Sequence, residues 1–304
     1  MTRLVFLGSP GAALASLELL ADRFDVGLVV TQPDRPRGRS GTPRPPPVKE
    51  RAEELGISVA QPKRRSEIAE AISDAGSFDL GVVVAYGMIL DPEVLAIPEA
   101  GVLNVHFSLL PRWRGAAPVA RAVIAGDTMT GVTIIKLDEG LDTGPVLTAQ
   151  GVDIEPGENA GHLTDRLAGL GARLVGSVIP GYLAGQVVPV TQSDEGATYA
   201  DKITSDDRPL DVSATPAEFV AWVRGLAPDP GATLEIDGER HKILEARASD
   251  WGPEPGTWAL HQDVPIVGVS EGGVELVELQ PPGKRPQAGA DWARGRRRSL
   301  GSVR

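Results

Sequence analysis

The sequence contains no cysteine among its 304 residues. This absence excludes disulfide bonds, thiolate metal sites and a cysteine nucleophile, and it fits a reducing cytoplasm. Long apolar runs are also absent: Leu80–Ala85 is far shorter than the roughly 20 residues that a membrane-spanning helix needs. The first residues have neither the longer apolar region nor the small-residue cleavage site of a signal peptide. We therefore expect a cytoplasmic protein, not a secreted, membrane or zinc-finger protein.

The composition is that of an ordinary globular protein, with 41% hydrophobic and 23% charged residues, and the length suggests two domains. The formal net charge is −11, but the charge is unevenly distributed. Residues 34–65 carry a net charge of +5 and residues 284–304 a net charge of +6, which leaves −22 on the rest of the chain. These two basic blocks are either a polyanion-binding surface or simply solvated, and charge alone does not decide between the two.

Strand-like and helix-like segments alternate up to about residue 188. This pattern predicts an α/β domain with an open, mostly parallel, Rossmann-like sheet, which binds ligands outside the carboxyl ends of its strands. The expected strands are 4–8, 26–31, 80–85, 102–106, 132–137 and 146–154, and the expected helices are 12–21, 50–55, 66–75 and 160–184. Residues 34–49 are rich in Pro, Arg and Gly without an apolar period, and we expect a loop there.

The remainder of the chain has a different pattern. Residues 190–209 are polar and turn-rich, which is typical of a linker. One helical stretch, 216–225, precedes short strand-like pieces at 233–236, 241–246, 257–260, 266–269 and 274–279. Closely spaced short strands predict a small, OB-like β-barrel. The predicted organisation is therefore a catalytic domain at 1–189, a linker at 190–206 and a C-terminal β-barrel domain at 207–304.

Asn104 and His106 occupy the carboxyl end of an expected strand. Side chains alternate along a strand, so these two point to one face, while Val105 and Phe107 point to the core. A histidine titrates near neutral pH and an asparagine amide is a neutral donor, so together they can stabilise an oxyanion at an acyl group. The alternative for an isolated Asn-x-His is a buried polar pair whose hydrogen bonds are made by the backbone.

A second polar cluster, 138–144 (DEGLDTG), follows the expected strand 132–137. We expect this loop to lie at the same end of the sheet as Asn104 and His106. A carboxylate beside an imidazole can act as a base or as a proton relay. The alternative is an Asx turn that uses glycine for its positive φ.

These residues lie within segments that resemble the methionyl-tRNA formyltransferase family. The matching segments are TQPDRPRGR (31–39), VVAYGMIL (83–90), NVHFSLLPRWRGAAP (104–118), GLDTG (140–144) and LQPPGK (279–284). They are collinear and spread over most of the chain. The central segment is shared across folate-dependent formyltransferases, whereas the basic loop and LQPPGK point more narrowly to the tRNA enzymes.

The resemblance implies transfer of a formyl group from 10-formyltetrahydrofolate to initiator methionyl-tRNA, giving N-formylmethionyl-tRNA for translation initiation. Asn104, His106 and Asp142 match the catalytic residues of the family, with Asp142 either a base or an electrostatic partner of His106. The folate-binding residues implied are Ser108, Leu109, Leu110, Pro111, Tyr86 and Gly87. The tRNA-binding residues expected are Arg35, Arg37, Arg39, Arg44, Lys49, Lys284 and Arg285, and we add Arg296-Arg297-Arg298 as a contact with the acceptor stem. No metal is implied, and we expect a monomer.

One departure and three rival functions remain. Phe107 stands where the family commonly has glycine. Strand alternation predicts that it faces away from the site; the alternative is that the strand ends before it and that its ring narrows the substrate pocket. The rivals are a sugar-nucleotide N-formyltransferase, a formyl-folate hydrolase in which water is the nucleophile, and an RNA-binding protein that keeps only the fold. The Arg-rich loop argues against the first, the two basic blocks against the second, and the complete set of Asn104, His106 and Asp142 against the third.

Overall fold

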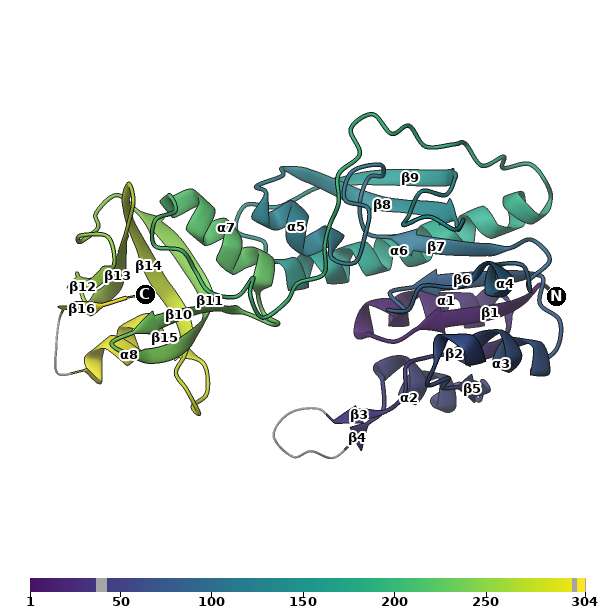
Figure 1. Ribbon diagram of the computed structural model, residues 1–304, viewed down its shortest axis with the longest axis horizontal. Coiled ribbons are helices and arrows are strands. Elements are labelled where there is room, and N and C mark those ends of the chain that lie inside the picture. Colours follow the sequence, from purple (N-terminus) through teal and green to yellow (C-terminus); the bar gives the residue numbers. More distant parts are fainter. Residues whose placement is uncertain (37–42, 297–299, 304) are drawn as a thin grey trace. The chain divides into compact units, whose positions relative to one another are not determined.

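The computed structural model describes residues 1–36, 43–296 and 300–303 (Figure 1). The chain forms two compact units: the first comprises residues 1–118, 130–152 and 164–200, and the second residues 119–129, 153–163 and 201–304. The predicted linker, 190–206, is therefore divided between the two units. Within the described residues, no helix combines the length and the apolar character that crossing a membrane would require.

A seven-stranded sheet in the order β5-β2-β1-β6-β7-β8-β9 is the centre of the first unit. Its strands are β1 (Arg3–Gly8), β2 (Asp25–Val30), β5 (Val59–Ala60), β6 (Leu80–Val84), β7 (Val102–His106), β8 (Met129–Lys136) and β9 (Val146–Asp153). The pairs from β5 through β7 are parallel, and β7 pairs with β8 in antiparallel fashion. The predicted open, mostly parallel sheet is confirmed.

Helices cover this sheet on both sides, and its central strands β6 and β7 are buried on both faces, as parallel strands usually are. The helical elements are η1 (Gly11–Ala13), α1 (Leu14–Arg23), α2 (Pro47–Glu54), η3 (Arg65–Glu67), α3 (Ile68–Asp74), α4 (Pro92–Leu95) and α6 (Ala160–Leu183). Ile68 and Ile72 of α3 and Val94 of α4 form one core cluster with Val5 and Leu7 of β1.

The segment 34–49 contains more regular structure than the sequence predicts. β3 (Arg35–Pro36) pairs with β4 (Pro43–Arg44), and α2 already begins at Pro47. A two-residue strand pair is too short to show a period, and proline at the first helical position is favoured because its fixed φ suits a helix start. The expectation of a loop over all of 34–49 is therefore wrong at its ends.

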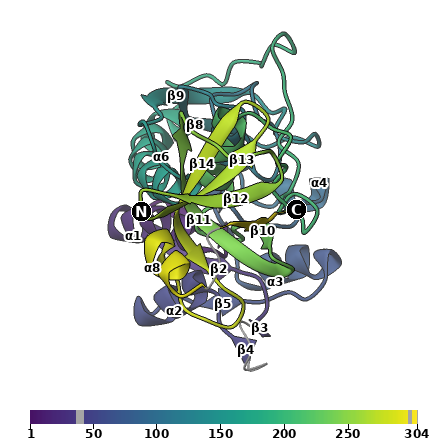
Figure 2. The ribbon, with the colours of Figure 1, turned by 90° about the vertical axis from the view of Figure 1, so that its left-hand side faces the viewer.

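The second unit contains a seven-stranded antiparallel sheet, in which six strands follow the order β10-β11-β14-β13-β12-β16 (Figure 2). Its strands are β10 (Ala232–Ile236), β11 (Glu239–Ser249), β12 (Thr257–His261), β13 (Val264–Val269), β14 (Gly272–Gln280) and β16 (Leu300–Ser302), with β15 (Gln287–Ala288) added to β14. A bridge between Ile236 and Val303 joins the two ends of the sheet, which confirms the predicted barrel.

Three helices accompany the second unit: α5 (Pro118–Ile124), α7 (Pro216–Leu226) and α8 (Gly289–Arg294). Thr215 begins α7 with a capping box, in which its side chain accepts from the Glu218 N–H and Glu218 returns a bond to Thr215. Trp258 and Trp292 are buried in the core of this unit.

Candidate active site

Strand β7 places the two candidate catalytic residues on one face of the sheet. Asn104 and His106 are both buried, with 9% and 5% of their surfaces exposed. Val105 and Phe107 point the other way, because a Cβ added at Gly171 of α6 would lie 2.5 Å from Val105 Cγ1 and 3.4 Å from Phe107 Cε1. The predicted alternation is confirmed, and Phe107 packs against α6.

The loop between β8 and β9 brings Asp142 to these residues by a route that the sequence does not predict. β8 runs antiparallel to β7, so Lys136 near its end pairs with Leu103 near the beginning of β7. The loop therefore starts at the end of the sheet where β7 begins, opposite the carboxyl end of β7. The expectation that the loop starts at the carboxyl end of β7 is wrong, because it requires β8 to be parallel to β7.

The loop nevertheless returns toward β7 by doubling back tightly. The Lys136 N–H donates to the Pro145 carbonyl at 2.9 Å, which closes the base of the loop. Gly144 lies so close to the Lys136 carbonyl that a side chain has no room there. Asp142 itself has a φ of +53°, in the left-handed region that few non-glycine residues adopt.

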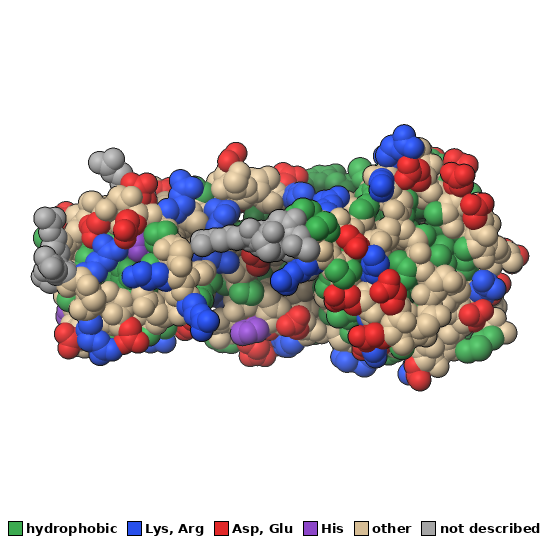
Figure 3. All heavy atoms as spheres, turned by 90° about the horizontal axis from the view of Figure 1, so that it is seen from below, with side chains coloured by type: hydrophobic (Ala, Val, Ile, Leu, Met, Phe, Trp, Pro, Cys, Tyr) green, Lys and Arg blue, Asp and Glu red, His purple; other side chains and the backbone are tan. Residues whose placement is uncertain are grey.

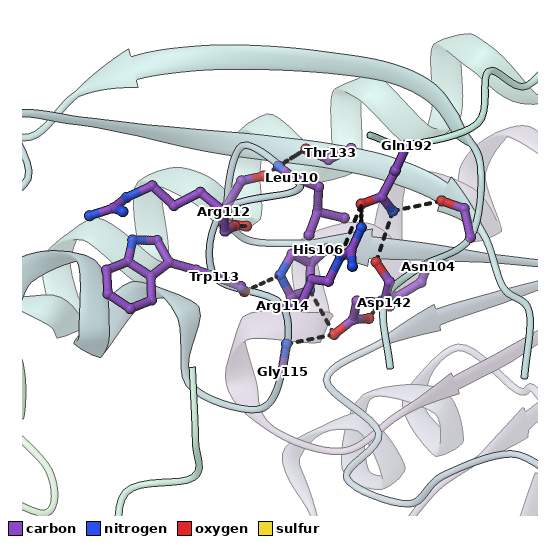
Figure 4. A network of polar contacts seen from close by, with 12 residues as sticks. Asn104, His106, Leu110, Arg112, Trp113, Arg114, Gly115, Thr133, Asp142 and Gln192 are labelled. Carbon is purple, nitrogen blue, oxygen red and sulfur yellow. Dashed lines mark hydrogen bonds and ion pairs between the residues drawn. The ribbon is translucent and has the colours of Figure 1, made fainter. Parts of the chain in front are cut away.

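Asp142 lies at the centre of a buried polar cluster (Figure 4). Its Oδ1 accepts from Asn104 Nδ2 at 3.1 Å, and its Oδ2 accepts from the Gly115 N–H at 2.9 Å. The same Oδ2 lies 3.6 Å from His106 Nδ1. The structure thus brings together the amide, the imidazole and the carboxylate that the sequence singles out.

The tautomer of His106 follows from its second partner. Nε2 lies 2.8 Å from the Trp113 carbonyl oxygen, which can only accept a hydrogen bond. Nε2 therefore carries a hydrogen and donates it, which fixes the orientation of the ring. Nδ1 faces Asp142 and is the nitrogen available for exchanging a proton with the site.

The implied folate-binding segment 108–111 is held firmly beside the cluster. Ser108 is buried, and its hydroxyl donates to the Arg112 carbonyl at 2.6 Å. Thr133 of β8 donates to the Ser108 carbonyl at 2.7 Å and accepts from the Leu110 N–H at 3.1 Å. Leu109, Leu110 and Pro111 are partly exposed, so this turn presents apolar surface next to polar groups.

The Tyr86-Gly87 turn presents its backbone instead of its aromatic ring. Tyr86 is 2% exposed, and its ring belongs to the core cluster formed with β1 and α3. Burial raises the pKa of Tyr86 to about 12. Its carbonyl accepts from Gln32 Nε2 at 3.3 Å, and Gly87 is exposed with a φ of +83°. Any ligand contact made by Tyr86 must therefore use main-chain atoms.

The first basic block, residues 34–65, has both exposed cations and a lysine held in an ion pair. Arg35 and Arg44 are exposed on β3 and β4. Lys49, expected to bind tRNA, instead pairs with Asp34 at 2.9 Å; hydrogen bonds from Gln61 and Lys49 lower the pKa of Asp34. The remaining residues expected in this block, Arg37 and Arg39, lie outside the described residues.

The second basic block also divides into exposed and structural groups. Lys284 and Arg285 are exposed in the turn after β14. Arg296 pairs with Asp237 at 2.8 Å and Glu239 at 3.1 Å and stacks on Trp292, so its guanidinium serves the barrel. The interpretation of Arg296 as a stem contact is therefore replaced by a structural role, and Arg297 and Arg298 lie outside the described residues. Figure 3 shows basic side chains in groups among acidic ones on one face.

Two residues of the cluster were not found by the sequence analysis. Gln192 donates from Nε2 to the carbonyls of Asp142 (2.8 Å) and Gly144 (2.7 Å), and Arg114 donates to Gln192 Oε1. The polar, turn-rich composition of 190–209 gave no signal for this, because the partners of Gln192 are two main-chain carbonyls and an arginine, all distant in sequence. Among the described residues there is no group of three or more His, Asp or Glu side chains placed to bind a metal.

Comparison with known families covers nearly the whole chain. Residues 4–179 match the family model described as "Formyl transferase", and residues 202–297 match "Formyl transferase, C-terminal domain". The chain is 47% identical over 300 residues to the methionyl-tRNA formyltransferase of Halorhodospira halophila, covering 97% of this chain and 96% of that protein. It is 43% identical over 306 residues to the enzyme of that name from Cutibacterium acnes, covering 96% of each.

Solved structures show the same fold at low sequence identity. An N-formyltransferase from Helicobacter canadensis, solved with folinic acid and dTDP-3-aminofucose, has a TM-score of 0.71 at 16% identity, covering 92% of this chain and 100% of that chain. The sugar 3N-formyl transferase WlaRD, solved with dTDP and 5-N-formyl-THF, has a TM-score of 0.69 at 15% identity, covering 94% of this chain and 99% of that chain.

Proposed function

This chain belongs to the methionyl-tRNA formyltransferase family, and on that premise we propose that it transfers the formyl group of 10-formyltetrahydrofolate to the amino group of initiator methionyl-tRNA. The observation that carries the proposal is the buried cluster of Asn104, His106 and Asp142. An amide, an imidazole and a carboxylate in contact supply the donors and the base that formyl transfer to an amine needs.

Asn104 and His106 stabilise the oxyanion. A free α-amino group titrates near pH ~8, so part of it is neutral and nucleophilic at physiological pH. As its nitrogen bonds to the formyl carbon, Asn104 donates the Nδ2 hydrogen that is not bound to Asp142, and His106, in the form with a proton on both ring nitrogens, donates from Nδ1, since Nε2 is bound to Trp113. One such donor is typically worth about 10²–10³ in rate.

Asp142 and His106 move the protons. Asp142, held by the Gly115 N–H and by Asn104, accepts the proton that the amine loses and later returns it to His106 Nδ1, which lies 3.6 Å from its Oδ2. His106 delivers a proton to the donor nitrogen as the bond between that nitrogen and the formyl carbon breaks. The pair therefore ends with the protons it began with. General acid–base help of this kind contributes about 10²–10⁴ in rate.

We assign the two substrates to residues in different parts of the sequence. We assign the folate donor to Ser108–Pro111 and to the 138–144 loop, which adjoin the cluster. The family resemblance adds the main chain at Tyr86 and Gly87. We assign tRNA phosphates to the exposed Arg35, Arg44, Lys284 and Arg285, with Lys49 anchoring the first block. The family resemblance adds Arg37 and Arg39. We also propose that the protein is a monomer in the cytoplasm.

A sugar-nucleotide N-formyltransferase is the second candidate, because solved structures with that activity share this fold. An assay that offers methionyl-tRNA and amino-sugar nucleotides side by side, with 10-formyltetrahydrofolate, separates the two. We expect formylation of methionyl-tRNA and no measurable product on the sugars. Formylation of a sugar nucleotide alone would replace the proposal, and release of formate without either acceptor would indicate a hydrolase.

A further inference from the structure

Residues 190–200 belong to the first unit and take part in the candidate active site. Val146 and Val190 exchange backbone hydrogen bonds of 2.8 Å beside the catalytic loop. Farther along, the Arg114 N–H donates to the Thr198 carbonyl at 2.9 Å, and the Ala200 N–H donates to the Arg114 carbonyl at 2.7 Å. These backbone bonds fix the segment in place over the residues that follow β7.

The side chain of Gln192 uses its whole amide group within this segment. Nε2 donates to the carbonyls of Asp142 at 2.8 Å and Gly144 at 2.7 Å, while Oε1 accepts from Arg114 Nε at 3.3 Å and Nη2 at 3.1 Å. A glutamine amide has two donor hydrogens and one acceptor oxygen, so every polar atom of this side chain has a partner. Figure 4 shows the amide of Gln192 joined by dashed lines to Arg114 and to Asp142.

Arg114 links Gln192 to the main chain that holds His106 and Asp142. Its side chain is only 3% exposed, and its carboxylate partner, Asp194 at 3.0 Å, is 92% exposed. Burying a guanidinium is costly unless its donors are bonded, and Gln192 supplies much of that bonding. The neighbours of Arg114 in the chain are Trp113, whose carbonyl holds His106, and Gly115, whose N–H holds Asp142.

We propose that Gln192, held by Arg114, is a positioning residue for formyl transfer. It fixes the main chain of Asp142 in its left-handed conformation, so that the carboxylate stays on the Gly115 N–H and beside His106 Nδ1. An aspartate keeps such a conformation only where its surroundings hold it, and two carbonyls bound to one amide are such a constraint. This inference rests on the proposed function, because it assigns Asp142 a part in that reaction.

The test compares Gln192→Met with Gln186→Met. Methionine has nearly the length of glutamine but donates no hydrogen bonds and carries no charge. Gln186 is exposed after α6, which makes it a matched control. We expect Gln192→Met to lower kcat for methionyl-tRNA about 10- to 100-fold, since displacements of about 1 Å cost that much, with both KM values changed less than threefold. The pH profile of kcat should also shift, whereas Gln186→Met matches the wild type in both.

The possible outcomes separate the two proposals. Wild-type protein that does not formylate methionyl-tRNA overturns the proposed function, whatever Gln192 does. Active wild type together with a Gln192→Met variant that keeps the wild-type kcat and pH profile overturns the positioning role, even if its melting temperature falls. If Gln192→Met does not fold, Arg114→Lys replaces it in the test. This variant keeps the positive charge but loses the pair of hydrogen bonds that Nε and Nη2 of Arg114 donate to Gln192 Oε1. An Arg114→Lys variant with the wild-type kcat and pH profile equally overturns the role.

Discussion

Both carboxylate oxygens of Asp142 have partners in the candidate active site. Its two carboxylate oxygens accept from Asn104 and Gly115, and its Oδ2 lies 3.6 Å from His106 Nδ1. Asp142→Asn keeps the size of the side chain and removes its charge. We expect kcat to fall about 10²–10⁴-fold, the contribution of a general base, with little change in melting temperature. Asp165→Asn, on the exposed side of α6, is the control. A kcat for Asp142→Asn equal to that of the control would contradict the assignment.

His241 provides a prediction about stability and pH. Burial lowers its pKa, and its neutral form fits its partners: Nδ1 donates to the Glu239 carbonyl at 2.8 Å, and Nε2 accepts from Trp292 Nε1 at 3.1 Å. Because the unfolded chain binds the proton more tightly, the free energy of unfolding should fall as the pH drops below about 6.5 and level off below the folded pKa.

Denaturation followed by tryptophan fluorescence measures this, since four of the five tryptophans lie in the second unit. His241→Gln should remove that part of the pH dependence, and His162→Gln, at an exposed position, should keep it. Equal pH dependence in the wild type and in His241→Gln would show that another group is responsible.

At the scale of elements, α6 supports the catalytic strand through a close approach at Gly171. A Cβ there would lie 2.5 Å from Val105 Cγ1 of β7, whereas a Cβ at Gly169 of the same helix meets only Arg173 Nη1 at 3.6 Å. Gly169→Ala should therefore stabilise the protein by about 0.5–1 kcal/mol, and Gly171→Ala should destabilise it by about 1–3 kcal/mol. Thermal unfolding of the two variants provides the comparison. Equal shifts of the melting temperature in the same direction would mean that α6 can move away from β7 without loss of stability, which would contradict the prediction.

The elements also show what the sequence can and cannot predict. The alternation along β7 follows from residue spacing alone, so Asn104, His106, Val105 and Phe107 could be assigned to their faces. The direction of β8 could not, because apolar patterning does not encode whether a strand runs parallel or antiparallel to its neighbour. The family resemblance supplied Asp142, which local patterning alone would have left as part of a turn. No pattern marked Gln192, whose partners, two backbone carbonyls and the Arg114 side chain, are distant in sequence.

At the scale of the whole molecule, the distribution of charge predicts how tRNA binding responds to salt. A body of net −22 repels RNA, so affinity depends on the basic blocks and should fall as salt rises. Exchanging Lys284 and Arg285 together for Gln should raise the KM for tRNA and reduce the slope of log KM against log salt by about 0.9 per lost phosphate contact. The control, Arg173→Gln on α6, lies outside both blocks. An unchanged slope in the double variant would show that these two side chains do not meet phosphates.

The central claim is that the side chains gathered around His106 carry out formyl transfer to an aminoacylated RNA. Its most direct test is the single-turnover rate of methionyl-tRNA formylation by the wild type and by His106→Ala, with saturating formyl donor and with folate binding measured in parallel. We predict a rate at least about 10²-fold lower in the variant, with folate binding and melting temperature nearly retained. A variant that binds folate and formylates at the wild-type rate would contradict the account.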